Sequence, residues 1–178
     1  MAGDGGQAAL VADEPRRFFV EPEVLGGPSV TLTGDLAHRI SRVLRYGPGD
    51  EVILTAGGPK ESRLRLRTVS AKSVTGDIVG EQDGPAEPKV QVVLYQALIR
   101  ANRFDFALEK GTEAGVSRFV PVVCARTQGH GEEPSSKRAE RWRRLVVEAA
   151  EQCGRGRLPE ISDPLPFAEA LRTAPVSR

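Results

Sequence analysis

The protein is a chain of 178 residues, which is enough for one ordinary domain or two small ones. Apolar residues make up 39% of the chain and aromatic residues only 5%, so the core is expected to be aliphatic. Its 25 Lys and Arg residues and 24 Asp and Glu residues give a formal net charge of +1, which excludes a strongly cationic chain. A nucleic-acid role would therefore depend on local clusters of positive charge.

Two further classes are disfavoured by the sequence. No apolar run approaches the length of a membrane span, and the Gly-rich, acidic residues 1–14 predict a disordered tail and not a signal peptide. Cys124 and Cys153 lack metal-ligand spacing, and a cytoplasmic protein with free thiols is favoured over a secreted one with a disulfide.

The first half of the chain predicts short strands with one helix among them. The helix is expected at residues 34–45, with Asp35 as its N-cap and a turn after it. Its apolar stripe consists of Leu36, Ile40, Val43 and Leu44. Strands are predicted at residues 16–20, 29–32, 51–55, 62–69 and 73–79. In residues 62–69 leucines alternate with arginines, which indicates a half-buried strand with a basic outer face. This pattern is typical of a small β-barrel, expected over residues 15–82.

An acidic stretch with two prolines at residues 81–88 predicts a boundary, and we expect a linker at 83–89. Beyond it, strands and helices alternate as in a parallel α/β sheet, expected over residues 90–178. The predicted elements are a strand at 90–95, a helix at 102–115, a strand at 116–124, a long helix capped by Ser135 or Ser136, a strand at 159–162 and a helix at 167–171.

Three details of this second half are also predicted. The continuous apolar run at residues 90–95 indicates a strand buried on both faces. Pro121 predicts that the strand at 116–124 lies at an edge or contains a bulge. The buried face of the long helix is expected to carry Trp142, Leu145, Val146, Ala149 and Cys153.

The residues alone do not identify a reaction. His38 and His130 have no neighbouring nucleophile, and no metal cluster or glycine-rich phosphate loop is visible. The arginine clusters fit phosphate contacts and ordinary surface ion pairs about equally well. Glu148, Gln152 and Arg155 share one side of a helix end, where simple helix support is the favoured interpretation.

The chain resembles the RsmE family of 16S ribosomal RNA uridine-N3 methyltransferases. The resemblance runs from about Arg17 onward and rests on the order and spacing of short motifs. They are RFF at 17–19, HRISRVLR at 38–45, GPGD at 47–50, QALIR at 96–100, EKGTEAGV at 109–116, RW at 141–142, EAAEQCGR at 148–155 and PE at 159–160. The family has Gly-Asp where this chain has Ala101-Asn102.

This resemblance implies an α+β protein of two domains, a PUA-like RNA-binding β-barrel followed by the first part of a knotted SPOUT methyltransferase domain. It implies a homodimer that uses S-adenosyl-L-methionine to methylate N3 of a uridine in 16S rRNA of the small ribosomal subunit, in ribosome biogenesis. The family's Gly-Pro-Glu-Gly-Gly and Leu-Arg-x-Glu-Thr-Ala segments are absent, so the cofactor-binding knot is expected beyond Arg178.

Carried onto this sequence, the resemblance implies roles for individual residues. Arg155 is the candidate for stabilising the uridine anion. The residues expected to contact RNA are Arg17, His38, Arg42 and Arg45. The residues expected to shape the active site are Arg100, Glu113, Glu148 and Gln152. The alternatives are an RNA-binding module without catalytic activity and a non-functional truncated product.

Overall fold

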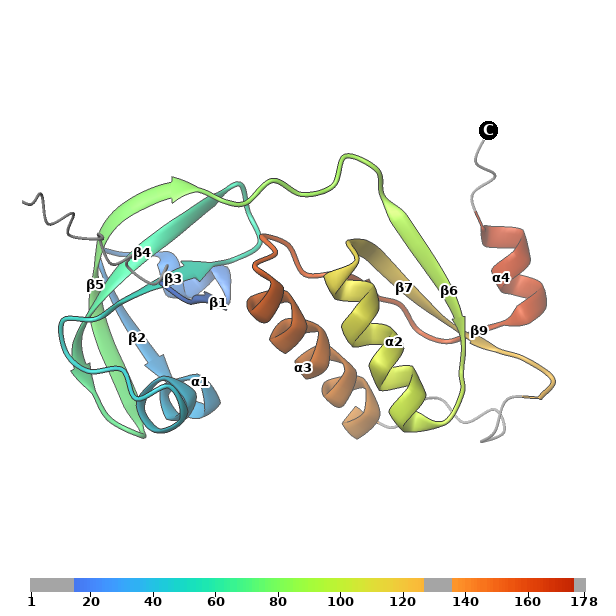
Figure 1. The fold of residues 1–178 in the computed structure, drawn as a ribbon, viewed down its shortest axis with the longest axis horizontal. Helices are drawn as coiled ribbons and strands as arrows, with labels where there is room; N and C mark the ends of the chain where they lie inside the picture. The colour runs from blue at the N-terminus through green and yellow to red at the C-terminus, as the bar shows by residue number, and fades with distance from the viewer. Residues whose placement is uncertain (1–14, 127–135, 175–178) are drawn as a thin grey trace, which may run out of the picture.

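The computed structural model describes residues 15–126 and 136–174. The predicted tail at 1–14, His130 and the candidate cap Ser135 lie outside these residues. A five-stranded mixed sheet is built from the first half of the chain and a smaller parallel sheet from the second half (Figure 1).

The mixed sheet contains all five strands that the sequence predicts for the first half. They are β1 (Arg17–Phe19), β2 (Ser29–Thr33), β3 (Glu51–Thr55), β4 (Lys60–Val69) and β5 (Ser73–Asp83). The strand order is β1-β3-β4-β5-β2, with β1 parallel to β3 and the other pairs antiparallel. The sheet curls, and its hydrogen-bonded path ends at β1 and β2, which do not pair with each other.

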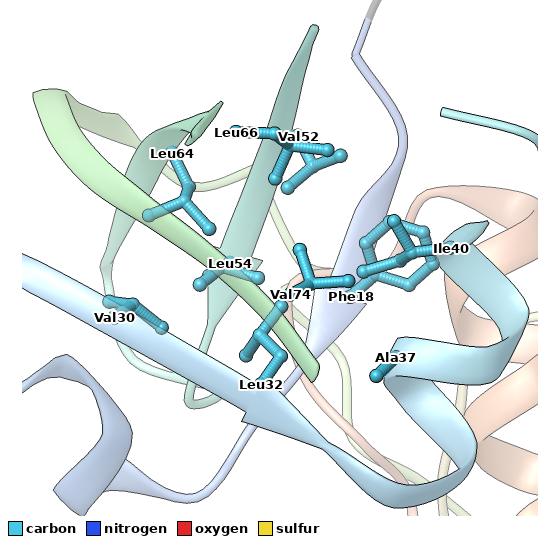
Figure 2. Close-up of a cluster of buried hydrophobic side chains, with 10 residues drawn as sticks. All are labelled: Phe18, Val30, Leu32, Ala37, Ile40, Val52, Leu54, Leu64, Leu66 and Val74. Carbon is cyan, nitrogen blue, oxygen red and sulfur yellow. The ribbon is translucent and has the colours of Figure 1, made fainter. Parts of the chain in front are cut away.

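The hollow side of this sheet holds an aliphatic core with one aromatic ring. Figure 2 shows side chains from all five strands gathered in one cluster with Ala37 and Ile40, which follow β2, and with Phe18 beside Ile40 at one side. Leu64 and Leu66 of β4 are buried, whereas Arg65 and Arg67 are exposed, which confirms the predicted alternation. Burying each such apolar side chain contributes about 1.5–3 kcal/mol.

β4 and β5 approach each other closely at Gly76. The pairing of these strands shifts register between Arg63 and Leu64 and again between Leu66 and Thr68, as in β-bulges, which bend a strand. A Cβ atom on Gly76 would lie 2.5 Å from the Arg65 carbonyl oxygen. A side chain is therefore excluded here by backbone and not by a movable neighbour.

The predicted helix at 34–45 is present but irregular. It consists of α1 (Gly34–His38), a short α-helix, followed by a π-helical turn, Arg39–Val43. Thr33 occupies the N-cap position and Asp35 lies inside the first turn, so the predicted cap is wrong. Val43 is 64% exposed, because the wider π turn rotates it off the apolar stripe.

The parallel sheet has β7 at its centre, with β6 on one side and β8 and β9 on the other. Figure 1 shows α2 and α3 side by side on one face and α4 on the other. The elements are β6 (Val92–Ala97), α2 (Ala101–Glu113), β7 (Val116–Val123), α3 (Ser136–Cys153), β8 (Glu160–Ile161), β9 (Leu165–Pro166) and α4 (Phe167–Thr173).

Two predictions about this half are wrong in detail, and a third is met in only one of its two alternatives. β6 is an edge strand with partly exposed side chains, so it is not buried on both faces. β7 is central and not an edge strand, because Pro121 faces the gap between β8 and β9, where Ser162 already bonds to the Phe119 carbonyl. The alternative of a bulge is met earlier in β7, where the pairing with β6 passes from Val116 directly to Arg118 and skips Ser117. Cys153 is exposed, although Trp142, Val146 and Ala149 on the same helix are buried as predicted.

A second core joins α2, α3 and β7. The rings of Phe104 and Trp142 lie 4.6 Å apart between their centroids and pack with Leu108, Phe119 and Val146. Gly115, with φ of 89°, ends the α2 turn in the left-handed conformation, as predicted for a C-terminal glycine.

We predict that Gly76→Ala lowers the free energy of unfolding by about 2–3 kcal/mol, because the added methyl group meets the Arg65 carbonyl. Gly80→Ala in the same strand is the matched control, since no atom lies within 4 Å of a Cβ built there. Urea unfolding measures both. Equal effects of the two substitutions would show that the close approach of β4 and β5 is not a constraint.

Candidate nucleic-acid interface and the docking of α3

Three cations on and after α1 point to solvent. His38, Arg42 and Arg45 are exposed, and within the described residues no ion pair or side-chain hydrogen bond engages them. We call these three residues the α1 cationic edge. Such a group of unpaired cations can contact successive phosphates of a nucleic acid.

Arg45 has an unusual backbone. Its φ is 58°, which makes it the only non-glycine residue in the left-handed region among those that the structure describes. This conformation ends the helical turn, and the Tyr46 N–H donates to the Ile40 carbonyl at 3.0 Å. A side chain costs about 1 kcal/mol in this region relative to glycine. The chain thus places an arginine where glycine would be the easier residue.

Arg17, the fourth cation expected to contact RNA, turns inward. Arg17 donates to both carboxylate oxygens of Glu61, at 2.5 and 3.1 Å, and to the Gly154 carbonyl at 3.2 Å. Its side chain is only 12% exposed and that of Glu61 is fully buried. The predicted RNA contact of Arg17 stays a prediction, but its guanidinium already links the curled sheet to the end of α3.

The carboxylate of Glu151 on α3 receives two groups from the curled-sheet half. The backbone N–H of Phe19 donates to one oxygen at 3.2 Å, and the Arg39 guanidinium donates to the other. Arg39 also lies over the Phe18 ring, 5.6 Å from its centroid. Together with the Arg17 contact, these bonds form what we call the α3 dock.

Arg155 follows α3 and joins three parts of the chain. It donates to the Glu87 carboxylate from two nitrogens and to the carbonyls of Thr112 and Val116. Glu87 also accepts the backbone N–H groups of Gly156 and Arg157. In this Glu87–Arg155 network the predicted catalytic arginine is 10% exposed and holds the connection between the two sheets. Its catalytic role is untested.

The residues expected to shape an active site lie in separate places. Glu113, Glu148 and Gln152 line a shallow groove of about 270 Å³ between α2 and α3. Arg100 lies at the other end of α2, and Arg155 faces away from the groove toward Glu87. The structure therefore does not bring Glu148, Gln152 and Arg155 to one point.

The remaining basic strip on β4 is largely neutralised. Arg63 and Arg65 pair with Glu51, and Arg67 pairs with Asp77 across the strands. These exposed pairs fit the interpretation as ordinary surface ion pairs. Within residues 15–126 and 136–174, no group of His, Cys, Asp and Glu could hold a metal ion, and no helix is long and apolar enough to cross a membrane.

Sequence reasoning missed Glu61, Glu87 and Glu151 as binding partners. Each lies far along the chain from its arginine, and nothing in its neighbourhood distinguishes it from a solvated carboxylate. Glu61 is out of phase with the inward-facing Leu64 and Leu66, and it reaches the buried face because the β4–β5 register shifts between Arg63 and Leu64.

The hydrogen bonds and charge around Glu87 lower the pKa of its carboxyl group. Burial raises the pKa of this carboxyl, but the hydrogen bonds and charge of Arg155 and the N–H groups of Arg157 and Gly156 together hold it below its usual 4.5. Because the folded-state pKa is the lower one, the carboxylate stabilises the fold fully above about pH 4.5. The contribution is lost as the pH falls through the folded-state pKa.

We predict that Glu87→Gln lowers the free energy of unfolding by about 1–3 kcal/mol at neutral pH, because Arg155 loses its charged partner. The free energy of unfolding of this variant also falls less steeply in acid, because an amide at this position has no proton to gain. Urea unfolding over a series of pH values measures both effects. The control is Asp83→Asn, which removes an exposed carboxylate paired with Lys60 and should leave stability at neutral pH unchanged. Equal losses in both variants would contradict the proposed network.

The chain is similar in sequence to known proteins. Ribosomal RNA small subunit methyltransferase E of Bacillus subtilis is 27% identical over 88% of this chain and 63% of that protein. The protein of the same name from Synechocystis is 34% identical over 86% of this chain and 49% of that protein. The chain thus spans about half to two thirds of the length of these relatives.

Solved structures show the same fold. The ribosomal RNA small subunit methyltransferase E of Neisseria gonorrhoeae, crystallised with S-adenosyl methionine, superposes with a TM-score of 0.81 at 28% identity. The match covers 91% of this chain and 66% of that one. A putative methyltransferase from Legionella pneumophila with bound cofactor gives 0.80 at 25% identity, over 91% of this chain and 67% of that one.

These matches agree that the protein is α+β, with a curled mixed sheet followed by a parallel one. Residues 86–177, slightly more than half of the chain, match the RNA methyltransferase domain, and the protein therefore belongs to that family.

Proposed function

We propose that this protein is an S-adenosylmethionine-dependent methyltransferase that acts in the cytoplasm on N3 of a uridine in 16S rRNA of the small ribosomal subunit. The likeness to the Neisseria gonorrhoeae enzyme with bound S-adenosyl methionine carries this proposal, because it extends over both sheets. The curled sheet would be a PUA-like RNA-binding unit. The parallel sheet would be part of a knotted SPOUT domain that works as a homodimer.

The chemistry requires charge control at the uridine. N3 loses its proton as the bond to the methyl carbon forms, so a base or a nearby cation must favour the N3 anion. The bound cofactor would supply the methyl group from its sulfonium, which leaves as a neutral thioether. We assign none of the described residues to the cofactor.

The α1 cationic edge is the proposed RNA contact of the curled sheet. Its support is the exposure of His38, Arg42 and Arg45 and the left-handed backbone of Arg45. We give Arg17 and Arg155 a positioning role instead, because their guanidinium groups are occupied by Glu61 and Glu87. Arg100, Glu113, Glu148 and Gln152 stay candidates for shaping the active site.

The direct test combines purified 16S rRNA, radiolabelled S-adenosylmethionine and the product of the complete reading frame. We expect transfer of label to one uridine, mapped by nuclease digestion and mass spectrometry to N3. The absence of N3-methyluridine, together with salt-dependent RNA binding, would instead support the alternative of an RNA-binding module without catalytic activity.

We predict opposite effects of Arg45→Gly on RNA binding and on stability. Loss of one phosphate contact weakens RNA binding and lowers the slope of log affinity against log salt by about 1. Glycine relieves the left-handed backbone, so the free energy of unfolding is unchanged or higher by up to about 1 kcal/mol. Filter binding at several salt concentrations and urea unfolding measure the two quantities.

A matched control is Arg65→Ala, which removes an exposed arginine already paired with Glu51. It should leave the salt dependence of RNA binding unchanged. If Arg45→Gly leaves RNA affinity unchanged as well, the α1 cationic edge is not a contact surface.

A further inference from the structure

A cavity of about 600 Å³ opens between the first turn of α2 and the first turns of α3. Leu98 and Ile99 line it where the chain leaves β6, and the ring of Trp142 closes one side beside Phe104. In open α/β sheets, ligands bind at this edge, beyond the carboxyl ends of the parallel strands. We call this cavity the α2–α3 pocket.

The polar lining of the α2–α3 pocket is strongly positive. Arg100, Lys137, Arg138 and Arg141 contribute four cations, and Asp105 is the only acid that lines it. Asp105 is mostly buried and pairs with Arg141. Within the described residues, no ion pair engages Lys137 or Arg138. The start of α2 adds a partial positive charge, since no acidic residue occupies its first turn.

The rest of the pocket is apolar, which separates it from a simple anion site. Leu98 is buried, Ile99 is 41% exposed, and the indole of Trp142 packs behind them. A flat, weakly polar ring could lie on this surface while an attached anion meets the cations. A nucleotide combines these two features, and stacking and phosphate contacts are how proteins hold single-stranded RNA.

We propose that the α2–α3 pocket binds one nucleotide of the RNA substrate, with its phosphate at Lys137 and Arg138 and its base against Ile99. The inference rests on the proposed function for the identity of the ligand. The cofactor does not fit this pocket, because its sulfonium and ammonium groups would face a cationic wall. An acidic peptide would leave the apolar wall unused.

The chain contains a single tryptophan, so Trp142 fluorescence reports directly on the pocket. The test titrates the protein with uridine 5′-monophosphate, uridine, inorganic phosphate and S-adenosylmethionine separately. We expect a saturable change with uridine 5′-monophosphate, binding about tenfold weaker with uridine or phosphate alone, and no response to the cofactor. Lys137→Ala and Arg138→Ala should each weaken nucleotide binding severalfold.

Arg144→Ala is the matched control, since it removes an exposed charge from the same helix outside the pocket lining. It should leave nucleotide affinity unchanged. The proposal is overturned if the nucleotide gives no saturable signal, or if phosphate alone or the cofactor binds as well as the nucleotide does. It is also overturned if Arg144→Ala weakens nucleotide binding as much as Lys137→Ala. RNA binding that still depends on Arg42 and Arg45 would then leave the proposed function standing.

Discussion

The Glu151 carboxylate, at the end of α3, is the point on which the arrangement of the two sheets depends. It accepts the backbone N–H of Phe19 and the guanidinium of Arg39, both from the curled-sheet half. Its side chain is only 7% exposed, so an unpaired charge there would be costly. Burial of the Glu151 carboxylate is therefore favourable only when the two sheets are docked, because only then do Phe19 and Arg39 reach it.

The Glu87–Arg155 network reinforces the same junction from the other side. Glu87 accepts hydrogen bonds from the Arg155 guanidinium and from the backbone N–H groups of Gly156 and Arg157. A stretch that looks like a solvated linker in the sequence is thus held to the helix end. These contacts hold the α1 cationic edge and the α2–α3 pocket in a fixed position relative to each other, as expected if both contact one RNA.

The sequence predicted the periodic features well. The alternation of leucine and arginine in β4, the glycine that stops the chain after α2 and the buried Trp142 all follow from local sequence pattern. It failed where tertiary context decides. Val43 leaves its stripe because of a π turn. The edge position considered for the Pro121 strand is wrong, because two short strands leave a gap opposite the proline and so tolerate it in a central strand. The partners of Arg17 and Arg155 could not be predicted, because ion pairs between distant segments leave no periodic signal.

The most direct measurement is a double-mutant cycle on Arg39 and Glu151. The free energy of unfolding is measured for Arg39→Ala, Glu151→Gln and the double variant. If the α3 dock joins the two halves, the cycle gives a coupling energy of about 1–3 kcal/mol, and each single variant is destabilised by at least that amount. A coupling energy near zero would show that the two sheets fold without help from this contact and would contradict the account.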